Sequence, residues 1–187
     1  PGLFAKVAGA LSLGGINIVD AKIVTLNNGM ALDTFWVQDG QSEAISGDAR
    51  MARIESRLER ALSGLASPAW ELKEARANAM PSRTSVFKVP PRVLIDNKAS
   101  RTYTVIEVNG RDRLGFLHDI TNVLTNAGLQ IASAHISTYG ERVVDVFYVK
   151  DIFGLKMEQP NKIEDVRTKL LAAITATGAS AESEAAE

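Results

Sequence analysis

The chain has 187 residues and is nearly neutral, with 21 lysine and arginine residues against 22 aspartate and glutamate residues, so no overall positive field recruits nucleic acid or anionic lipid. It contains no cysteine, which excludes disulfides and thiolate metal sites and fits a reducing compartment. Its apolar runs all fall short of the roughly 18 residues that a membrane-spanning helix needs.

The sequence contains one pattern twice. Residues 1–39 align with residues 114–151 after a one-residue gap near Asn28. Residues kept in both copies include the pairs Gly2/Gly115, Gly15/Gly128, Ala21/Ala134, Asp33/Asp145 and Phe35/Phe147. A repeat of this length is a complete folding unit, so the sequence predicts two similar domains.

The first copy begins directly with an expected helix, at Pro1-Gly2-Leu3-Phe4. In the second copy, a predicted strand over residues 101–109 and a turn over residues 110–113 precede the matching helix. We therefore expect the chain to be cut inside its first domain. The alternative is a mature protein whose first copy never had this strand.

In the first copy, the helix ends at Gly14-Gly15, and strands follow over residues 16–26 and 30–38 with a turn at Asn27-Asn28-Gly29. A second helix is predicted from an apolar face of Met51, Ile54, Leu58, Ala61, Leu62 and Leu65. Residues 66–83 are interpreted as a linker or an extension of that helix.

A β-rich segment lies between the copies, over residues 84–89 and 93–96, interrupted by Pro90-Pro91. We expect it to supply the closing strand of the first copy, and it is also a candidate for a strand shared between the two sheets.

The second copy repeats the order of elements. Its first helix has an apolar stripe and ends at Gly128, strands follow over residues 129–139 and 142–150 with a turn at Gly140-Glu141, and a helix carries Ile163, Val166, Leu170 and Ile174. The complete pattern is β-α-β-β-α-β, the ferredoxin-like unit. The small, acidic tail from Thr177 predicts disorder.

Each sheet is expected to carry helices on one face only, so the copies should pack against each other within the chain or across a dimer. The aromatic strand residues are candidates for the core or for that contact. They are Phe35, Trp36, Phe147 and Tyr148.

The turn before the second copy's first helix is the best candidate site. A helix start offers unpaired amide donors and partial positive charge to an anion, and Gly115 allows a ligand carboxylate to approach the backbone closely. Asp112 could bind an ammonium group, so one turn can bind both charged groups of a free amino acid. Gly2 is the equivalent of Gly115 in the first copy. Asn17 is the other polar residue expected near that end, and its counterpart in the second copy is Gln130. The simpler alternative is that Asp112 only caps the helix and Asn17 satisfies a turn.

Two other features have simpler interpretations. His118-Asp119 has the form of a metal-hydrolase dipeptide, but the only other histidine is His135, so a solvent-facing pair in the first turn of the helix is expected. A second feature is a row of arginines on the first copy's second helix, at Arg50, Arg53, Arg57 and Arg60. It predicts a solvated face paired with Asp48, Glu55 and Glu59, with docking to an acidic partner as the alternative.

The stretch PGLFAKVAGALSLGGINIVDAKI resembles an ACT domain, a small module that often binds amino acids. The stretch from Val93 to Asp151 resembles more specifically the C-terminal tandem ACT region of bifunctional PII uridylyltransferase/uridylyl-removing enzymes. The resemblance implies an α+β fold of two ferredoxin-like βαββαβ domains in tandem, the first without its first strand. The implied bounds are residues 1–96, residues 97–176 and a tail over residues 177–187.

Enzymes of this family attach UMP to the PII signal protein when glutamine is scarce and remove it when glutamine is plentiful. Their nucleotidyltransferase and HD domains precede the ACT pair and use a divalent metal, expected to be magnesium. This sequence contains neither catalytic domain, so we expect no catalytic residue, metal site or cofactor in it.

The resemblance implies a cytoplasmic glutamine sensor, with glutamine and, through the parent enzyme, PII as partners, and no nucleic acid or membrane. By position, the implied ligand residues are Asp112, Arg113, Gly115 and Phe116 in the second copy, Gly2, Leu3 and Asn17 in the first, and Gln130. Leu114 replaces the usual proline of the family motif and Gln130 the usual asparagine, so the second copy is expected to bind differently or only to complete the first copy's site. The alternatives are a stand-alone ACT-repeat protein that binds amino acids and a purely structural pairing module.

Overall fold

The two sequence copies fold as consecutive α-β-β-α units in the computed structural model, which describes residues 2–25, 30–39, 45–78 and 89–175. The first copy contains α1 (Leu3–Leu13), β1 (Ile16–Thr25), β2 (Ala31–Asp39), α2 (Asp48–Leu62) and α3 (Pro68–Ala77). The second contains β3 (Arg92–Asp96), β4 (Thr104–Arg111), α4 (Phe116–Asn126), β5 (Leu129–Tyr139), β6 (Arg142–Asp151) and α5 (Pro160–Thr175). The predicted α+β fold and the Gly140-Glu141 turn are confirmed.

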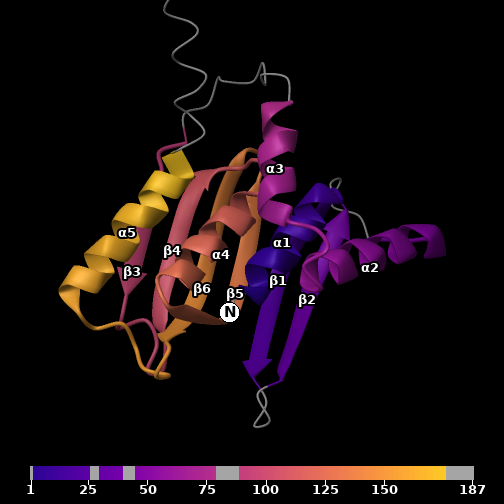
Figure 1. Cartoon of the computed structure of the whole chain (residues 1–187). Helices are drawn as coiled ribbons and strands as arrows, with labels where there is room; N and C mark the ends of the chain where they lie inside the picture. The colour runs from indigo at the N-terminus through magenta and orange to yellow at the C-terminus, as the bar shows by residue number, and fades with distance from the viewer. Residues whose placement is uncertain (1, 26–29, 40–44, 79–88, 176–187) are drawn as a thin grey trace, which may run out of the picture.

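The six strands within the described residues form one antiparallel sheet in the order β2-β1-β5-β6-β4-β3 (Figure 1). The copies meet where β1 pairs with β5, through Asp20 to Lys22 and Ser133 to His135. The expected packing of one copy against the other therefore occurs within the chain, by joining two sheets edge to edge.

Strand β3 joins the second copy and not the first. It pairs with β4 over its whole length, from Arg92 opposite Asn109 to Asp96 opposite Val105. The expectation that residues 93–96 close the sheet of the first copy is therefore wrong. The physical reason is that a short connection returns β3 directly onto β4 as an antiparallel neighbour, in the place beside the first strand that a closing strand would take.

The helices cover one face of the sheet (Figure 1), and the strands alternate accordingly. In β6, buried Val143, Phe147 and Val149 alternate with half-buried residues that face away from the helices. Helices α1 and α4 pack against each other, and their buried residues belong to the same core cluster as Ile106, Phe147 and Leu170. The two copies consequently share one hydrophobic core.

Residues 66–83 contain a separate helix, α3. The preceding helix stops near Gly64, which has a φ of 80°, and Pro68 then occupies the first turn of α3. Left-handed glycine and first-turn proline are typical ends and starts of helices, so the segment is neither a plain linker nor an extension of α2.

Within the described chain, the aromatic strand residues do not form the junction between the copies. Phe147 is fully buried, and Phe35 packs on Phe4 with 5.3 Å between ring centroids. Trp36 is 48% exposed, so it belongs to neither the core nor the junction. The paired residues at the junction are small or polar: Asp20, Ala21 and Lys22 of β1, and Ser133, Ala134 and His135 of β5.

Several predicted features lie outside the described residues. They are the turn at residues 27–29, the strand segment at residues 84–88, the end of the linker at residues 79–83 and the tail from residue 177.

Candidate functional site

The candidate site is the turn that leads from β4 into α4. Gly115 precedes the helix with a φ of 72°, a left-handed conformation that favours glycine. Gly2 precedes α1 with a φ of 78°, so the equivalent residue of the other copy has the same conformation. Both helices therefore begin from a backbone that has no Cβ in the way of an approaching group.

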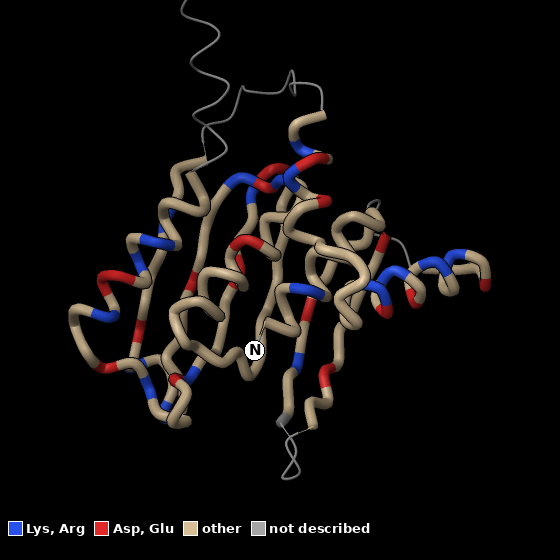
Figure 2. The backbone as a smooth tube through the Cα atoms, in the orientation of Figure 1, with Lys and Arg blue, Asp and Glu red and all other residues tan. Residues whose placement is uncertain are grey.

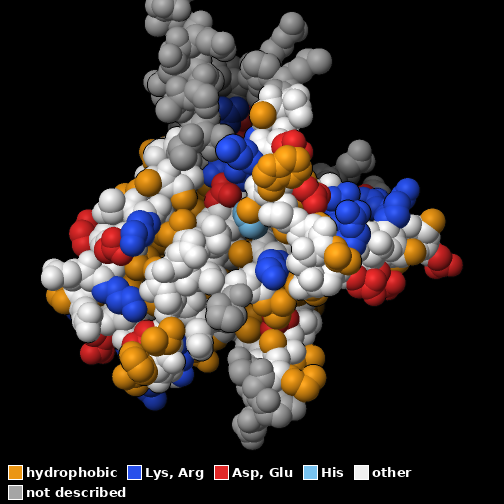
Figure 3. Space-filling model, viewed as in Figure 1, with side chains coloured by type: hydrophobic (Ala, Val, Ile, Leu, Met, Phe, Trp, Pro, Cys, Tyr) orange, Lys and Arg blue, Asp and Glu red, His pale blue; other side chains and the backbone are white. Residues whose placement is uncertain are grey.

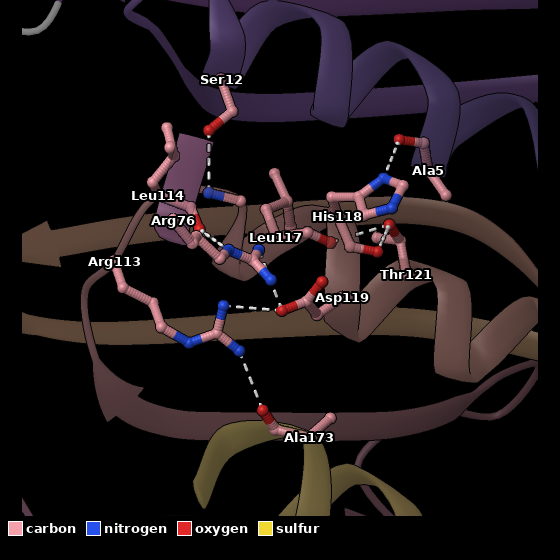
Figure 4. Close-up of polar contacts among 11 residues, drawn as sticks. Ala5, Ser12, Arg76, Arg113, Leu114, Leu117, His118, Asp119, Thr121 and Ala173 are labelled. Atoms are coloured by element: carbon pink, nitrogen blue, oxygen red, sulfur yellow. Dashed lines mark hydrogen bonds and ion pairs between the residues drawn. The ribbon is translucent and has the colours of Figure 1, made fainter. Parts of the chain in front are cut away.

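Both copies contribute to this turn. Helices α1 and α4 lie antiparallel, so the end of α1 in the first copy lies beside the start of α4 in the second. The N–H of Gly115 donates to the Oγ of Ser12, near the end of α1, over 2.9 Å (Figure 4). At the other end of the helix pair, a Cβ added to Gly2 would lie 3.7 Å from Cγ2 of Thr125, the residue equivalent to Ser12. Each helix start thus faces the end of the other copy's helix.

Helix α3 covers the Gly115 turn. A Cβ added to Gly115 would lie 2.9 Å from Cδ1 of Leu72 and closer still to the guanidinium of Arg76. Leu72 is 1% exposed, and Nε of Arg76 donates to the carbonyl oxygen of Leu114 over 2.9 Å. The space over the helix start, where a ligand would approach, is therefore filled by side chains of the first copy.

Two arginines share one carboxylate beside this turn (Figure 4). The Oδ2 of Asp119 lies 2.6 Å from Nη1 of Arg113 and 3.1 Å from Nη2 of Arg76. Arg113 also donates to the carbonyl oxygen of Ala173 over 2.9 Å and lies over the ring of Phe116. The cluster connects α3, α4 and α5, and with Asp112 beside Arg113 the turn holds two guanidinium groups and two carboxyl groups. Guanidinium groups of this kind can bind a ligand carboxylate.

His118 lies between α1 and α4, and its solvent-facing interpretation is wrong. Its Nδ1 lies 2.7 Å from the carbonyl oxygen of Ala5, which can only accept, so Nδ1 carries the proton. A Cβ added to Gly9 would lie 2.8 Å from this nitrogen, so the imidazole occupies the space that Gly9 leaves between the helices. His118 therefore has a packing role here.

The carboxyl groups of Asp145 and Asp112 interact electrostatically near the turn. Asp145, on the helix-covered face of β6, is fully buried, and neither of its oxygens makes a well-formed hydrogen bond with a described residue. Burial raises the pKa of Asp145 well above 3.8, the Ser137 amide opposes this, and the charge of Asp112 adds to it. Burial therefore favours the neutral form of the Asp145 carboxyl relative to an exposed aspartate.

Asp112 keeps contact with solvent, yet partial burial raises the pKa of its carboxyl, more than Arg113 lowers it. Its N–H donates to the carbonyl oxygen of Glu141 over 2.7 Å, which fixes the turn against the β5–β6 hairpin. The equivalent of Asp145 in the first copy is Asp33, and burial raises its pKa as well.

The predicted site residues fall into three places. Asp112, Arg113, Gly115 and Phe116 form one turn, while Gly2 and Leu3 lie at the opposite end of the α1–α4 pair. Asn17 and Gln130 are exposed strand residues between buried neighbours, so they face away from the helix layer. The structure does not bring Asn17 or Gln130 to the helix side of the sheet, where the turn lies.

Sequence reasoning missed five residues at the site: Ser12, Leu72, Arg76, Asp119 as an ion-pair partner, and Asp145. One signal pointed to Asp145, because a carboxylate recurs at the inward position of the return strand in both copies. Nothing in the sequence pointed to Leu72 or Arg76, which reach the turn from a segment 38 or more residues away in the chain.

No group of three or more histidine, aspartate or glutamate residues within the described ranges could hold a metal ion. The described helices include none long and apolar enough to cross a membrane.

Comparison with known proteins gives a consistent result. Residues 99–176 match the family model of the ACR family N-terminal ACT domain. The chain is 56% identical over 175 residues to the bifunctional uridylyltransferase/uridylyl-removing enzyme of Azospirillum brasilense, covering 92% of this chain and 18% of that protein. The enzyme of the same name from Gluconobacter oxydans is 51% identical over 94% of this chain, again covering 18% of the relative.

The Rhodospirillum rubrum enzyme of that name is 50% identical over 95% of this chain and 19% of its own length. No solved structure matches the chain. The chain thus spans less than a fifth of the length of the relatives that it matches. The resemblance to the tandem ACT region of bifunctional uridylyltransferase/uridylyl-removing enzymes is confirmed, and residues 99–176 match the ACT domain model of the ACR family.

Proposed function

We propose that this chain is the glutamine-sensing region of a bifunctional enzyme that uridylylates and deuridylylates the PII signal protein. Support comes from the similarity to enzymes of that name over 92% or more of the chain. In this proposal the chain regulates catalysis carried out elsewhere in the longer protein, in the cytoplasm, and PII is met by the whole enzyme.

The Gly115 turn is the observation that carries the proposal. It combines a glycine-opened helix start, an aspartate and two arginines, and residues of both copies complete it. A free amino acid carries one carboxylate and one ammonium group, and this turn offers a partner for each.

Glutamine binding follows from these groups. Its carboxylate binds the amide of Gly115 and the guanidinium of Arg76 or Arg113, and its ammonium binds Asp112. In the structure the N–H of Gly115 donates to the hydroxyl of Ser12, and Arg76 lies over it, so both side chains must move aside when the ligand binds. Because Ser12 belongs to α1 and Arg76 to α3, binding at one turn changes contacts between the two copies, as a sensor requires.

Glutamate is expected to bind less well than glutamine. Its second carboxylate would add a negative charge to a turn that already contains Asp112 and Asp119. Like charges in a partly desolvated site repel, so the neutral side-chain amide is preferred.

Titration calorimetry on the chain tests the ligand. Asp112→Ala should weaken glutamine binding about tenfold, the effect of one charge-assisted hydrogen bond at an exposed position. Glu158→Ala, an exposed carboxylate outside the turn, is the matched control and should leave affinity unchanged. Absence of saturable binding at millimolar glutamine, or equal affinity in Asp112→Ala and Asn17→Ala, contradicts the proposed site.

A further inference from the structure

A pocket lies away from the Gly115 turn, where the end of α1 meets α2 and α3. It has a volume of about 590 Å³, within the usual range for small-molecule sites. Four arginines of α2 line it, at Arg50, Arg53, Arg57 and Arg60, against a single carboxylate, Glu71. Figure 2 shows basic positions recurring along α2, and Figure 3 shows basic side chains gathered over this helix.

The local ion pairs of α2 leave part of this charge uncompensated. Arg50 lies 3.5 Å from Asp39 of β2, and Arg57 lies 3.7 Å from Glu71 of α3. Arg53 and Arg60 make no ion pair with any residue in the described part of the chain, and both are exposed. The predicted pairing of this row with Asp48, Glu55 and Glu59 is absent among the described contacts.

The spacing of the free arginines suits an extended anion. Arg53 and Arg60 are seven residues apart in one helix, which separates their Cα atoms by about 10 Å along the axis, with Arg57 between them. Guanidinium groups bind phosphate and carboxylate oxygens through paired N–H donors. The row therefore fits several linked anionic groups better than a single small ion.

The rest of the pocket lining is largely apolar. It includes Ala10, Leu11 and Ile16 of the first copy's core, together with Ile54 and Ala61, which lie on α2 next to Arg53 and Arg60. Apolar side chains beside a row of cations suit a molecule with an uncharged part and a polyanionic part.

The fold itself does not require this row. The equivalent positions on α5 hold Lys162, Asp165, Lys169 and Ala172, and Lys169 is neutralised by Asp165 at 2.7 Å. Two helices with the same place in the repeat thus differ in charge, and only α2 borders the pocket. The balanced charges of α5 show that an exposed helix face at this place in the repeat does not need a row of arginines.

We propose that this pocket is a binding site for a nucleoside polyphosphate, with its phosphates on Arg53, Arg57 and Arg60 and its base against the apolar side chains of Leu11 and Ile54. The site is separate from the Gly115 turn and does not depend on glutamine binding there.

Titration calorimetry of the 187-residue chain with ATP, pyrophosphate and adenosine, without metal, tests the proposal. ATP should bind saturably, pyrophosphate more weakly and adenosine most weakly, because only ATP can contact both the arginines and the apolar lining residues. Arg53→Ala combined with Arg60→Ala should reduce ATP affinity at least about tenfold, since two charge-assisted contacts are lost. Amide NMR shifts on ATP addition should concentrate at Ala10, Ile54 and Ala61.

The matched control is Arg167→Ala combined with Lys169→Ala, which removes the same charge from the exposed face of α5 and should change ATP affinity less than about twofold. Thermal melts by circular dichroism check folding, and Arg53→Gln and Arg60→Gln replace the double variant if it is unstable. Any of three results overturns the proposal: no saturable ATP binding, equal binding of pyrophosphate and ATP, or equal losses in the test and control variants. Binding of a glutamate-rich peptide that depends on Arg53, with no ATP binding, would instead identify a docking surface for an acidic protein.

Discussion

Ala21 and Ala134 pair across the junction between β1 and β5, and they occupy the same position in the two sequence copies. The flanking pairs, Asp20 with His135 and Lys22 with Ser133, exchange equivalent positions in the same way. An approximate two-fold axis therefore passes between the two alanines. The chain has the geometry of a symmetric dimer whose two members are joined in one polypeptide.

The first prediction concerns packing at this axis, between β1 and β5. Ala134 is fully buried beneath the helix pair, so Ala134→Leu should lower the free energy of unfolding by about 1–3 kcal/mol through overpacking. Ala31→Leu, at an exposed position of β2, is the control and should change it little. Urea unfolding measures both, and equal stability of the two variants would show that the junction is not tightly packed.

A second prediction concerns Gly115. Gly115→Ala should destabilise the chain by more than the roughly 1–2 kcal/mol that a left-handed alanine costs, because its Cβ would also collide with Leu72 and Arg76. Gly140→Ala is the control, since Gly140 has a φ of 62° and open space around its Cβ position. The Gly140 variant measures the cost of left-handed backbone strain alone, so the additional loss in the Gly115 variant measures the collision with α3. Equal losses in chemical unfolding would mean that α3 does not cover the turn in solution.

The third prediction is a pH dependence. The pKa of Asp145 is raised by folding, so its contribution to stability is complete below the unfolded value of about 3.8 and is lost as the pH rises towards the folded pKa. Asp145→Asn replaces the carboxyl by an amide that does not titrate, so the variant does not lose this part of its unfolding free energy as the pH rises. The variant should therefore gain stability relative to the parent chain as the pH is raised from acid to neutral.

Urea unfolding at a series of pH values measures that difference directly, because other titrating groups cancel between the two proteins. Asp165→Asn, an exposed carboxylate on α5, should give a much smaller change with pH. A difference between Asp145→Asn and the parent that stays constant with pH would show that folding does not raise the pKa of Asp145.

The fourth prediction links Ser12 to the ligand. Ser12→Ala leaves the N–H of Gly115 without its acceptor and should cost about 1 kcal/mol of stability. If glutamine places its carboxylate on the same N–H, the variant should bind glutamine more tightly than the parent chain, and saturating glutamine should reduce its stability deficit. Ser63→Ala, whose hydroxyl contacts only the exposed end of α2, is the control. Weaker glutamine binding by Ser12→Ala would show that the ligand needs the hydroxyl and does not replace it.

The sequence alone determined the repeated unit. Spacings of apolar residues predicted α1, β1 and β2 and their counterparts α4, β5 and β6, because helix and strand periodicity are local properties of the chain. The same reasoning located the turn from Asp112 to Phe116 as a helix start opened by glycine, which the structure has at that position.

Only the tertiary structure decided how these units combine. Periodicity cannot show that β1 pairs with β5, that β3 returns to β4, or that Leu72 and Arg76 lie over Gly115. These contacts join residues far apart in the chain, and their formation depends on which sheet edges and helix ends remain free after local folding. For the same reason the burial of His118 and Asp145, which local pattern left open or assigned to solvent, follows from the neighbours that the completed fold places around them.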